Sequence, residues 1–305
     1  HSQTNPYLTD FMNSVDDEIH FINKSKPSTS GLFDIIRYLG KIKFVIFNWP
    51  ENMVERSFGV LQSIFFFLLL PYLKIRSIKI IYVVHNKISH SNNHYFMKKL
   101  ITSTLIKKSD LMITHAKDGV DFINSFRKRT MNVHYFPHPL KDERPFPDVE
   151  KTIDILIWGN IAPYKGIHTF LEKLKESDYL KGVSVVIAGK VSSAEYLQKL
   201  NDLKSDNVEI LNSFLDDQEL KLKILSSKVV LFPYFPESIL SSGAFAKTIA
   251  FPVEIIGPDC GSFSDFSYLE NVNTFRDSDE MIKILESRLS SNVNLTNDDS
   301  DSIID

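Results

Sequence analysis

The sequence predicts an α/β protein with two Rossmann-like domains whose parallel sheets face a cleft. Short apolar runs rich in β-branched residues alternate with helical patterns, as in chains built from βαβ units. A segment with four prolines in sixteen residues, 136–151, divides this pattern into two halves. The length of 305 residues is sufficient for two domains.

The alternation is clearest in the second half. Apolar runs predict strands at 153–159, 183–189, 207–211, 228–234 and 252–257. Helical patterns fill the intervals, at 168–177, 193–203, 216–227 and 241–251. Asp216 and Glu219 stand at the spacing of a capping box, which predicts the start of the third helix.

The first half is similar in kind. Predicted strands lie at 43–47, 79–85, 110–116 and 132–136, with helices between them. We therefore expect an N-terminal domain at 1–140, a linker at 141–152, a C-terminal domain at 153–290 and a polar tail at 291–305.

Composition and charge restrict the class of protein. The hydrophobic content of 43% and the charged content of 24% are those of a soluble globular protein. Cys260 is the single cysteine, which excludes a disulfide framework and a cysteine-rich metal site and favours a reducing, cytosolic compartment. Residues 1–145 hold 20 Lys and Arg against 12 Asp and Glu. This basic half suggests an anionic partner, such as a phosphorylated acceptor, an anionic membrane surface or nucleic acid, or else a solvated surface without a partner.

One apolar run tests for a membrane span. Ile64 to Leu70 are all apolar, Pro71 closes the run, and Lys74, Arg76 and Lys79 follow. A spanning helix needs about 20 apolar residues, so the run is too short. A buried helix is the favoured interpretation, and a helix that contacts a membrane surface is the alternative.

The candidate chemistry lies just after predicted strands, because open α/β sheets bind ligands beyond the carboxyl ends of their strands. The loop after 153–159 carries Lys165 between glycines, which suits an anion at a helix start, although an ordinary βα turn remains the alternative. The loop after 228–234 carries Glu237, a group of hydroxyls and a glycine before a helix. The hydroxyls and the glycine are Ser238, Ser241, Ser242 and Gly243. They could bind a pair of phosphates or could simply cap the helix.

The strand at 79–85 ends in His85 and Asn86. A histidine there could hydrogen-bond a substrate hydroxyl or could be a satisfied core residue. His90 and His94 are spaced i,i+4, but no glutamate completes a zinc motif, so we expect no metal site. The triplet Asp277–Asp279 does not follow a strand early in a nucleotide-binding domain, and we do not expect it to bind a metal.

Together these segments resemble a known family. "GNIAPYKGIHTFLEKL", "VVIAGK", "LNSFLDDQELKLKILSSKVVLFPY" and "ESILSSGAFAKTIAFPVEIIGPDCGSFSD", in this order, are similar to the donor-binding domain of GT-B glycosyltransferases, the retaining family-4 type of bacterial polysaccharide synthesis above all. "NPYLTDFMNSV" and "VVHN" resemble the acceptor domain of the same group.

The resemblance implies metal-independent transfer of a hexose from a nucleotide sugar to a glycan or lipid-linked acceptor, with no cofactor and no nucleic acid. It implies catalytic roles for His85, Lys165 and Glu237. Contacts to the donor diphosphate and sugar would come from Asn160, Lys165, Ser238, Ser241, Ser242 and Gly243. Gly189 and Phe214 would lie near the base, and Asn86 and His90 would lie on the acceptor side. We expect a cytoplasmic protein, with peripheral contact at the inner face of an anionic membrane.

The chain departs from the family pattern at two positions. Asn160 stands where an arginine is usual, and Phe245 stands eight residues after Glu237 where a second glutamate is usual. These departures motivate a second hypothesis, a catalytically degenerate GT-B subunit that supports a partner enzyme. A sugar-nucleotide epimerase or a phosphorylase is the third. In the first half, Lys98, Lys99, Lys107 and Lys108 are expected at the edge of a partly buried helix, where they would attract the acceptor.

Overall fold

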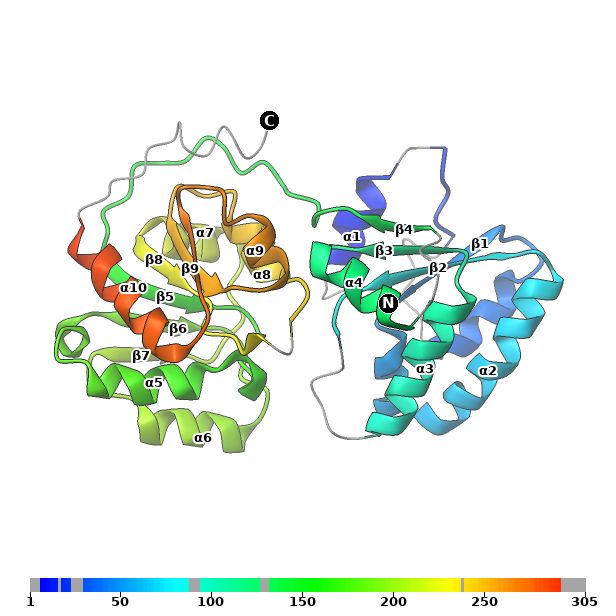
Figure 1. The fold of residues 1–305 in the computed structure, drawn as a ribbon, viewed down its shortest axis with the longest axis horizontal. Helices are drawn as coiled ribbons and strands as arrows, with labels where there is room; N and C mark the ends of the chain where they lie inside the picture. The colour runs from blue at the N-terminus through cyan, green and yellow to red at the C-terminus, as the bar shows by residue number, and fades with distance from the viewer. Residues whose placement is uncertain are drawn as a thin grey trace. The chain divides into compact units, whose positions relative to one another are not determined.

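The computed structural model describes residues 6–15, 18–22, 30–87, 94–126, 132–236 and 239–291. The chain divides into two compact units, His1–Pro139 (unit 1) and Leu140–Asp305 (unit 2), and Figure 1 shows a separate sheet in each. The predicted α/β class with parallel sheets is confirmed, because every strand pair in both sheets is parallel.

Unit 1 contains a four-stranded sheet in the order β1-β2-β3-β4. Its strands are β1 (Phe44–Asn48), β2 (Lys79–Val84), β3 (Leu111–Thr114) and β4 (Val133–Tyr135), each within a residue or two of a predicted strand. Its helical elements are α1 (Pro6–Asn13), η1 (Gly31–Tyr38), η2 (Pro50–Glu55), α2 (Gly59–Ile75), α3 (Tyr95–Lys108) and α4 (Lys117–Phe126). Because sequence neighbours are sheet neighbours and all run in parallel, the carboxyl ends of the four strands share one edge.

Helix α2 contains the apolar run that Pro71 closes in the sequence. The helix continues through Pro71 to Ile75. A proline inside a helix removes one backbone hydrogen bond, and burial of Leu69, Leu70 and Leu73 around it holds the helix in place. The expected burial holds for one face only, because Ile64 and Leu68 are exposed.

Helix α3 is partly buried, as its pattern predicted. Leu105 is buried, Phe96 is 76% exposed, and Lys99, Lys107 and Lys108 lie on the surface. Lys98 contradicts its prediction as a peripheral residue: it is only 2% exposed and pairs with Glu55. Lys98 and Lys99 cannot lie on the same face of α3, because successive residues on a helix are about 100° apart.

Unit 2 contains a six-stranded sheet in the order β10-β9-β8-β5-β6-β7. The strands are β5 (Ile153–Trp158), β6 (Val185–Ala188), β7 (Val208–Leu211), β8 (Ser227–Leu231), β9 (Glu254–Pro258) and β10 (Val272–Phe275). The first five match predicted strands, and β10 was not predicted. Between and after them lie η3 (Pro163–Lys165), α5 (Ile167–Glu176), η4 (Leu180–Gly182), α6 (Ala194–Leu203), α7 (Asp217–Leu225), α8 (Gly243–Thr248), α9 (Gly261–Asp265) and α10 (Ser278–Ser290).

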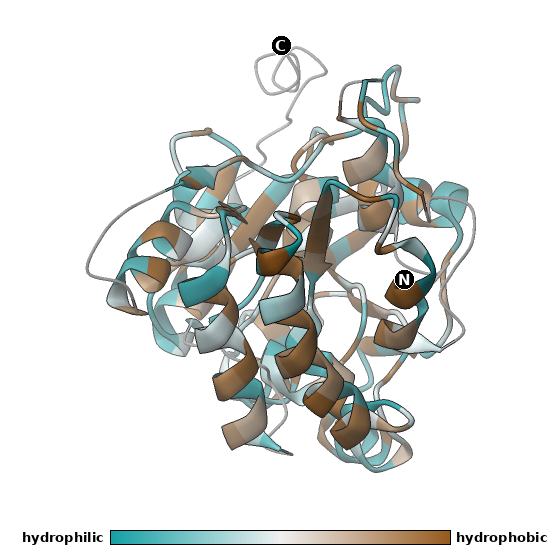
Figure 2. Ribbon diagram, turned by 90° about the vertical axis from the view of Figure 1, so that its right-hand side faces the viewer, coloured by the Kyte–Doolittle hydropathy of each residue, from teal (hydrophilic) through white to brown (hydrophobic). Residues whose placement is uncertain are grey.

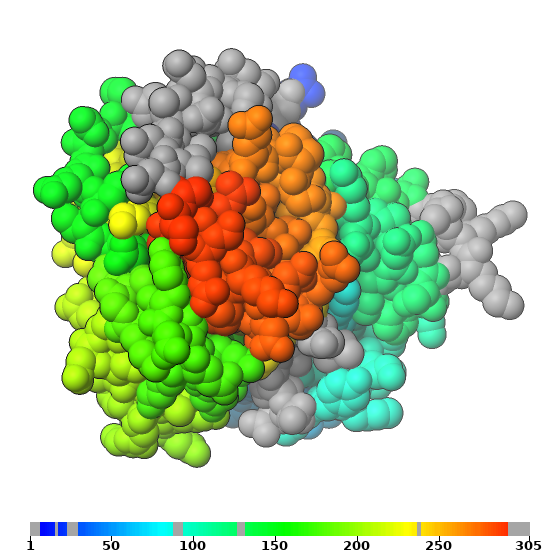
Figure 3. Space-filling view, turned by 60° about the vertical axis from the view of Figure 1, so that its left-hand side comes forward, coloured from blue at the N-terminus to red at the C-terminus, as the bar shows by residue number. Residues whose placement is uncertain are grey.

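Two apolar layers cover the faces of this sheet. On one face, α5, α6 and α10 pack through residues such as Phe170, Leu200 and Leu285. On the other, α7 and α8 contribute Ile224 and Phe245. Figure 3 shows α10, in red, beside α5 on the surface of unit 2.

Two helix starts in unit 2 are fixed by aspartates. Asp216 and Glu219 form the predicted capping box of α7. Asp277 caps α10 by accepting hydrogen bonds from the backbone N–H groups of Asp279 and Glu280. The Asp277–Asp279 triplet therefore has a structural role.

The segment predicted as a linker, 141–152, packs partly on unit 2. Phe146 is buried, and its ring centroid lies 5.2 Å from that of Phe251. The ammonium group of Lys221 lies over the same ring, with Nζ 5.3 Å from the ring centroid. The placement of the two predicted domains about a cleft stays a prediction.

Candidate functional site

The loop after β5 contains a buried lysine. Lys165 ends the short helix η3, and its side chain is only 7% exposed. Its Nζ lies 4.8 Å from the centroid of the Tyr234 ring, which follows β8. Among the described residues no carboxylate pairs with Lys165, and burial lowers the pKa of its ammonium group. The loop thus carries a desolvated cation that is compensated within the described part of the chain by an aromatic ring.

Glycines bring three segments together around this lysine. Gly159 has φ +108°, and a Cβ placed on it would lie 3.2 Å from Lys165 Nζ and 3.6 Å from Ala244 Cβ. A Cβ on Gly166 would meet the Pro233 carbonyl oxygen at 2.0 Å. The positive φ at Gly159 and the backbone clash at Gly166 favour glycine, and the contacts at Gly159 place the Lys165 ammonium group beside the first turn of α8.

Gly189, just after β6, also allows two segments of the backbone to approach closely. A Cβ on Gly189 would collide with the carbonyl oxygen of Gly159 at 1.8 Å. Its backbone N–H donates to Leu211 O at 2.9 Å, so it joins the ends of β6 and β7. The loops after β5, β6 and β8 therefore meet at the carboxyl edge of the sheet, where ligands bind in folds of this class.

The structure places the predicted hydroxyls unevenly. Ser242 is buried and caps α8, with its Oγ accepting from Phe245 N–H at 3.2 Å. Ser241 is half-buried and Gly243 is exposed at the first position of α8. Glu237 and Ser238 lie outside the described residues.

Two further predicted residues lie at the surface. Asn160 is exposed directly after Gly159 and makes no hydrogen bond within the described part of the chain. Phe214 is 80% exposed in the loop after β7. Both side chains are exposed, so only the backbone of the loop sets their positions.

A small hollow of about 200 Å³ lies at the same edge of unit 2. Its lining includes Gly166, Tyr234 and Phe235 on one side and Asp277 on the other. It therefore shares Tyr234 with the Lys165 contact.

Unit 1 has a cluster of aromatic and imidazole rings at the carboxyl edge of its own sheet. Tyr7 of α1 lies at its centre, with ring centroids 4.7 Å from His85, 5.4 Å from His115 and 5.3 Å from His138. Trp49 stacks on His85 at 4.0 Å. Each of Trp49, His85, His115 and His138 comes one to three residues after the end of a strand.

Hydrogen bonds fix how these histidines bind their protons. His85 Nε2 donates to Asn48 Oδ1 at 2.9 Å, since an amide oxygen can only accept. His115 Nδ1 donates to the Phe136 carbonyl oxygen at 2.8 Å, which leaves its Nε2 to accept from the Tyr7 hydroxyl at 2.8 Å. Neutral imidazoles satisfy both sets of hydrogen bonds.

Burial keeps these rings uncharged. It lowers the pKa of His85 well below its usual value, with smaller contributions from His115 and His138. Burial likewise lowers the pKa of His115, and it lowers the pKa of His138 to about 3. At neutral pH a substrate hydroxyl near this edge would meet neutral imidazoles, which can donate and accept hydrogen bonds.

Of the predicted acceptor-side residues, His85 joins this cluster and is 6% exposed. Asn86 is half-buried next to it, and His90 lies outside the described residues. The sequence reasoning missed Tyr7, Asn48, Trp49, His115 and His138. Asn48, Trp49 and His138 follow predicted strands and His115 lies at the end of one, so the same strand-end rule, applied to every strand of the first half, would have found these four.

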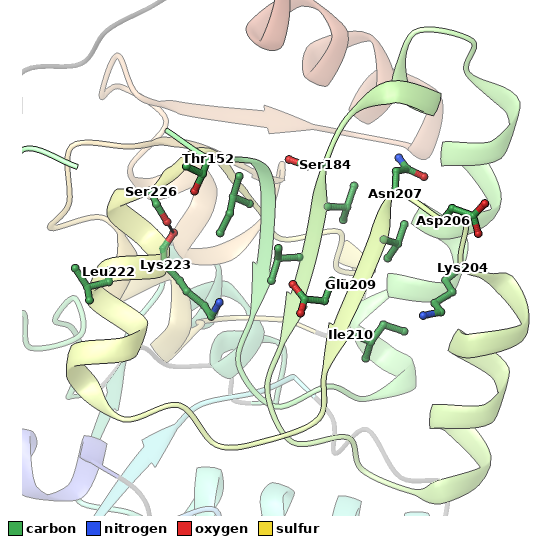
Figure 4. Close-up of a pocket in the computed structure, with 14 residues that line it drawn as sticks. Thr152, Ser184, Lys204, Asp206, Asn207, Glu209, Ile210, Leu222, Lys223 and Ser226 are labelled. Atoms are coloured by element: carbon green, nitrogen blue, oxygen red, sulfur yellow. Dashed lines mark hydrogen bonds between the residues drawn. The ribbon is translucent and has the colours of Figure 1, made fainter. Parts of the chain in front are cut away.

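A groove of about 760 Å³ lies elsewhere in unit 2. Figure 4 shows its lining side chains at the amino ends of β5, β6 and β7 and on α7, at the opposite edge from Gly159 and Gly189. Its Ser184 already pairs with Asp154, and Asp154 pairs with Lys228. These polar groups stabilise strand ends.

Within the described ranges, no three His, Cys, Asp or Glu side chains are grouped closely enough to hold a metal ion. In the same part of the chain no helix is long and apolar enough to cross a membrane.

The sequence matches no family model and no curated protein. The structure, in contrast, is similar to solved structures. Anabaena Alr3699/HepE in complex with UDP-glucose aligns with a TM-score of 0.65 and 11% identity over 88% of this chain and 74% of that one. The chain has the GT-B fold.

Two further GT-B structures agree with this assignment. A mutant of S. aureus TarM in complex with fondaparinux, α-GlcNAc-glycerol and UDP aligns with a TM-score of 0.56 and 15% identity. It covers 74% of this chain, which spans about half, 47%, of that one. The trehalose-6-phosphate synthase OtsA aligns with a TM-score of 0.52 and 12% identity over 77% of this chain and 68% of that one.

Proposed function

We propose that the protein is a metal-independent glycosyltransferase that moves a hexose from a nucleotide sugar to a hydroxyl of a glycan or lipid-linked acceptor. The observation that carries the proposal is Lys165. A lysine that is 7% exposed, has no carboxylate partner in the described residues and lies among glycines at the carboxyl edge of a parallel sheet is suited to an anionic ligand.

The chemistry of transfer explains why such a cation is useful. Cleavage of the bond between sugar and nucleotide leaves a diphosphate whose negative charge increases in the transition state. A cation held in a water-poor site stabilises that charge without reorganising, and loss of one such group costs about 3–4 kcal/mol of barrier. Lys165 would fill this role.

The solved structures support the proposal at the level of the donor. Alr3699/HepE binds UDP and UDP-glucose, and TarM binds UDP. We propose contacts from Asn160, Ser241, Ser242 and Gly243 to the diphosphate and sugar, and a location near the base for Gly189 and Phe214. Glu237 and Ser238 belong to the same proposal.

On the acceptor side, we propose that unit 1 binds the acceptor through His85, with Asn86 and His90 beside it. The neutral imidazole can hydrogen-bond a sugar hydroxyl. The neighbouring rings of Tyr7 and Trp49 would give the acceptor a polar and aromatic surface. We further propose polysaccharide or glycoconjugate synthesis in the cytoplasm of a bacterium, with peripheral contact between unit 1 and an anionic membrane.

A second candidate is a catalytically degenerate subunit, which one observation favours. Phe245, at the position where a glutamate is usual, is 1% exposed and packs on Phe263 with ring centroids 4.3 Å apart. This side chain belongs to the core and cannot hold a ribose hydroxyl. Nucleotide binding without turnover would be the property of such a subunit.

Two measurements separate the candidates. A thermal-shift panel of UDP, GDP and their sugar conjugates identifies the ligand, and nucleotide release with and without glycan or lipid-linked acceptors then measures transfer. Release that depends on an acceptor supports the enzyme. Stabilisation by a nucleotide without release under any acceptor supports the degenerate subunit, and no stabilisation by any nucleotide contradicts both.

A further inference from the structure

Helix α2 has an unusual distribution of polar and apolar residues. Gln62 and Ser63, two polar residues of this helix, are buried and make internal hydrogen bonds to Ser57 O and Gly59 O. The outer face of the helix is apolar. It consists of Val60, Leu61, Ile64, Leu68, Pro71, Tyr72 and Ile75, all exposed.

The exposure of this outer face is large. It runs from 40% for Tyr72 to 82% for Ile75, and Phe58, just before the helix, is 77% exposed. At about 100° per residue these positions form one continuous stripe of the helix. Figure 2 faces the side of unit 1 on which α2 lies, and the helices there are brown over much of their length. A helix with so many apolar residues is normally buried on all sides, so this stripe has no cover among the described residues.

The charges around the stripe indicate what covers it. From Arg56 to Ser109 the chain has nine Lys and Arg and no Asp or Glu. Arg56, Arg76, Lys99 and Lys108 are exposed and form no ion pair among the described residues. Arg56 precedes α2 and Arg76 follows it, so a basic group lies near each end of the stripe, and Lys99 and Lys108 add exposed charge on α3.

A second copy of the chain does not fit this face. Unit 1 holds 18 Lys and Arg against 10 Asp and Glu. Two such faces in contact would bring the same unpaired cations together, which is unfavourable. An anionic lipid surface offers both an apolar interior for the stripe and negative headgroups for its basic border.

We infer that the outer face of α2 inserts into the interface of an anionic membrane, with α2 lying in the membrane plane and its basic border on the headgroups. The inference rests on the proposed peripheral contact of unit 1 and specifies the surface that makes it. It does not depend on transfer, because the residues of the stripe belong to neither the proposed donor site nor the proposed acceptor site.

The test is co-sedimentation of the whole chain with vesicles, without nucleotide or acceptor. Vesicles contain phosphatidylglycerol with phosphatidylcholine, or phosphatidylcholine alone. We expect binding to the first kind only, with a steep loss as salt increases. Ile64→Gln/Leu68→Gln removes two apolar anchors without adding charge and should weaken binding about tenfold for each. Arg76→Gln/Lys108→Gln should weaken it roughly fivefold for each.

Leu222→Gln is the matched control, because Leu222 is an exposed leucine, 52%, on α7 of unit 2. It should bind vesicles like the wild type. All replaced side chains are exposed, and unchanged melting temperatures confirm the fold.

Equal sedimentation of the wild type and Ile64→Gln/Leu68→Gln would overturn the inference, as would the absence of binding to anionic vesicles. Light scattering provides a further check: a dimer that Ile64→Gln/Leu68→Gln dissociates would show that a second copy covers the stripe instead. Absence of nucleotide binding and of transfer in the wild type would contradict the proposed enzyme and leave this result unaffected.

Discussion

Replacement of Lys165 by methionine separates its proposed catalytic role from a structural one. Burial lowers the pKa of Lys165, so the folded chain holds this proton less tightly than the unfolded chain. Stability therefore decreases as pH falls below the unfolded pKa, because the unfolded chain binds the proton first. Near neutral pH, charging Lys165 costs about 1.4 kcal/mol for each unit of difference between the two pKa values.

The burial of Lys165 makes alanine a poor replacement for it. Lys165→Ala would leave the fold intact if the side chain were a flexible surface group, but the side chain is buried. Alanine removes three methylenes, worth about 0.8 kcal/mol each, so a loss of roughly 2 kcal/mol in stability would obscure the result. Lys165→Met keeps the apolar stem and removes only the charge. We expect its unfolding free energy to equal or exceed that of the wild type.

Function should change in the opposite direction. If Lys165 holds the diphosphate, Lys165→Met should reduce turnover by about 10²–10³, which corresponds to about 3–4 kcal/mol. The assays are urea unfolding, calorimetry with the nucleoside diphosphate that stabilises the wild type, and nucleotide release with acceptor. Lys190→Met, at an exposed lysine just after β6, is the control and should behave as wild type in all three.

Two results would refute the reasoning. Wild-type nucleotide affinity and turnover in Lys165→Met would remove Lys165 from the diphosphate site. A loss of about 2 kcal/mol or more in unfolding free energy would show instead that the cation over Tyr234 stabilises the fold.

Three other predictions concern metals, pH and the acceptor. Transfer should survive excess EDTA, since positive protein groups are proposed to replace the ion, and a complete loss that Mn²⁺ or Mg²⁺ restores would contradict this. Because the buried histidines of unit 1 have lowered pKa values, unfolding monitored in that unit should require less urea as pH falls below about 6.5, where the unfolded chain protonates. His115→Gln should reduce this dependence of the urea midpoint on pH. The control His20→Gln, at an exposed position, should leave it unchanged. The same pH dependence in His115→Gln as in the wild type would contradict the role given to the buried histidines. His85→Ala should reduce transfer more than nucleotide affinity, and weak nucleotide binding with normal turnover at saturation would show that the two halves are assigned the wrong way round.

Local sequence patterns identified most of the regular structure. Nine of the ten strands in the described ranges lie within apolar runs or directly beside them, because alternating and continuous apolar patterns depend only on neighbouring residues. The start of α7 was predicted for the same reason, since a capping box is complete within four residues. β10 was missed because Val272 and Phe275 are its only fully buried positions and no apolar run marks it.

The candidate site was also predicted only where local sequence carries the information. The loop of Lys165 could be found from glycines and a lysine after a strand, and His85 from its place at a strand end. The burial of Lys165 could not be found, because it depends on Tyr234 and Gly159 from other segments of unit 2. The prediction of Lys98 as a peripheral cation was wrong for the same reason: its partner Glu55 lies 43 positions away.

The positions of most strands and helices, the α/β class and the loops that are candidates for binding could all be predicted from the amino-acid sequence. These properties follow from short-range periodicity, caps and glycines. The tertiary structure was needed to show that Tyr7 joins three histidines from three different strand ends, and that α2 has an apolar face that no described residue covers. Burial and ring contacts are set by residues far apart in the chain, and each side chain's environment exists only after the sheet has aligned its strands.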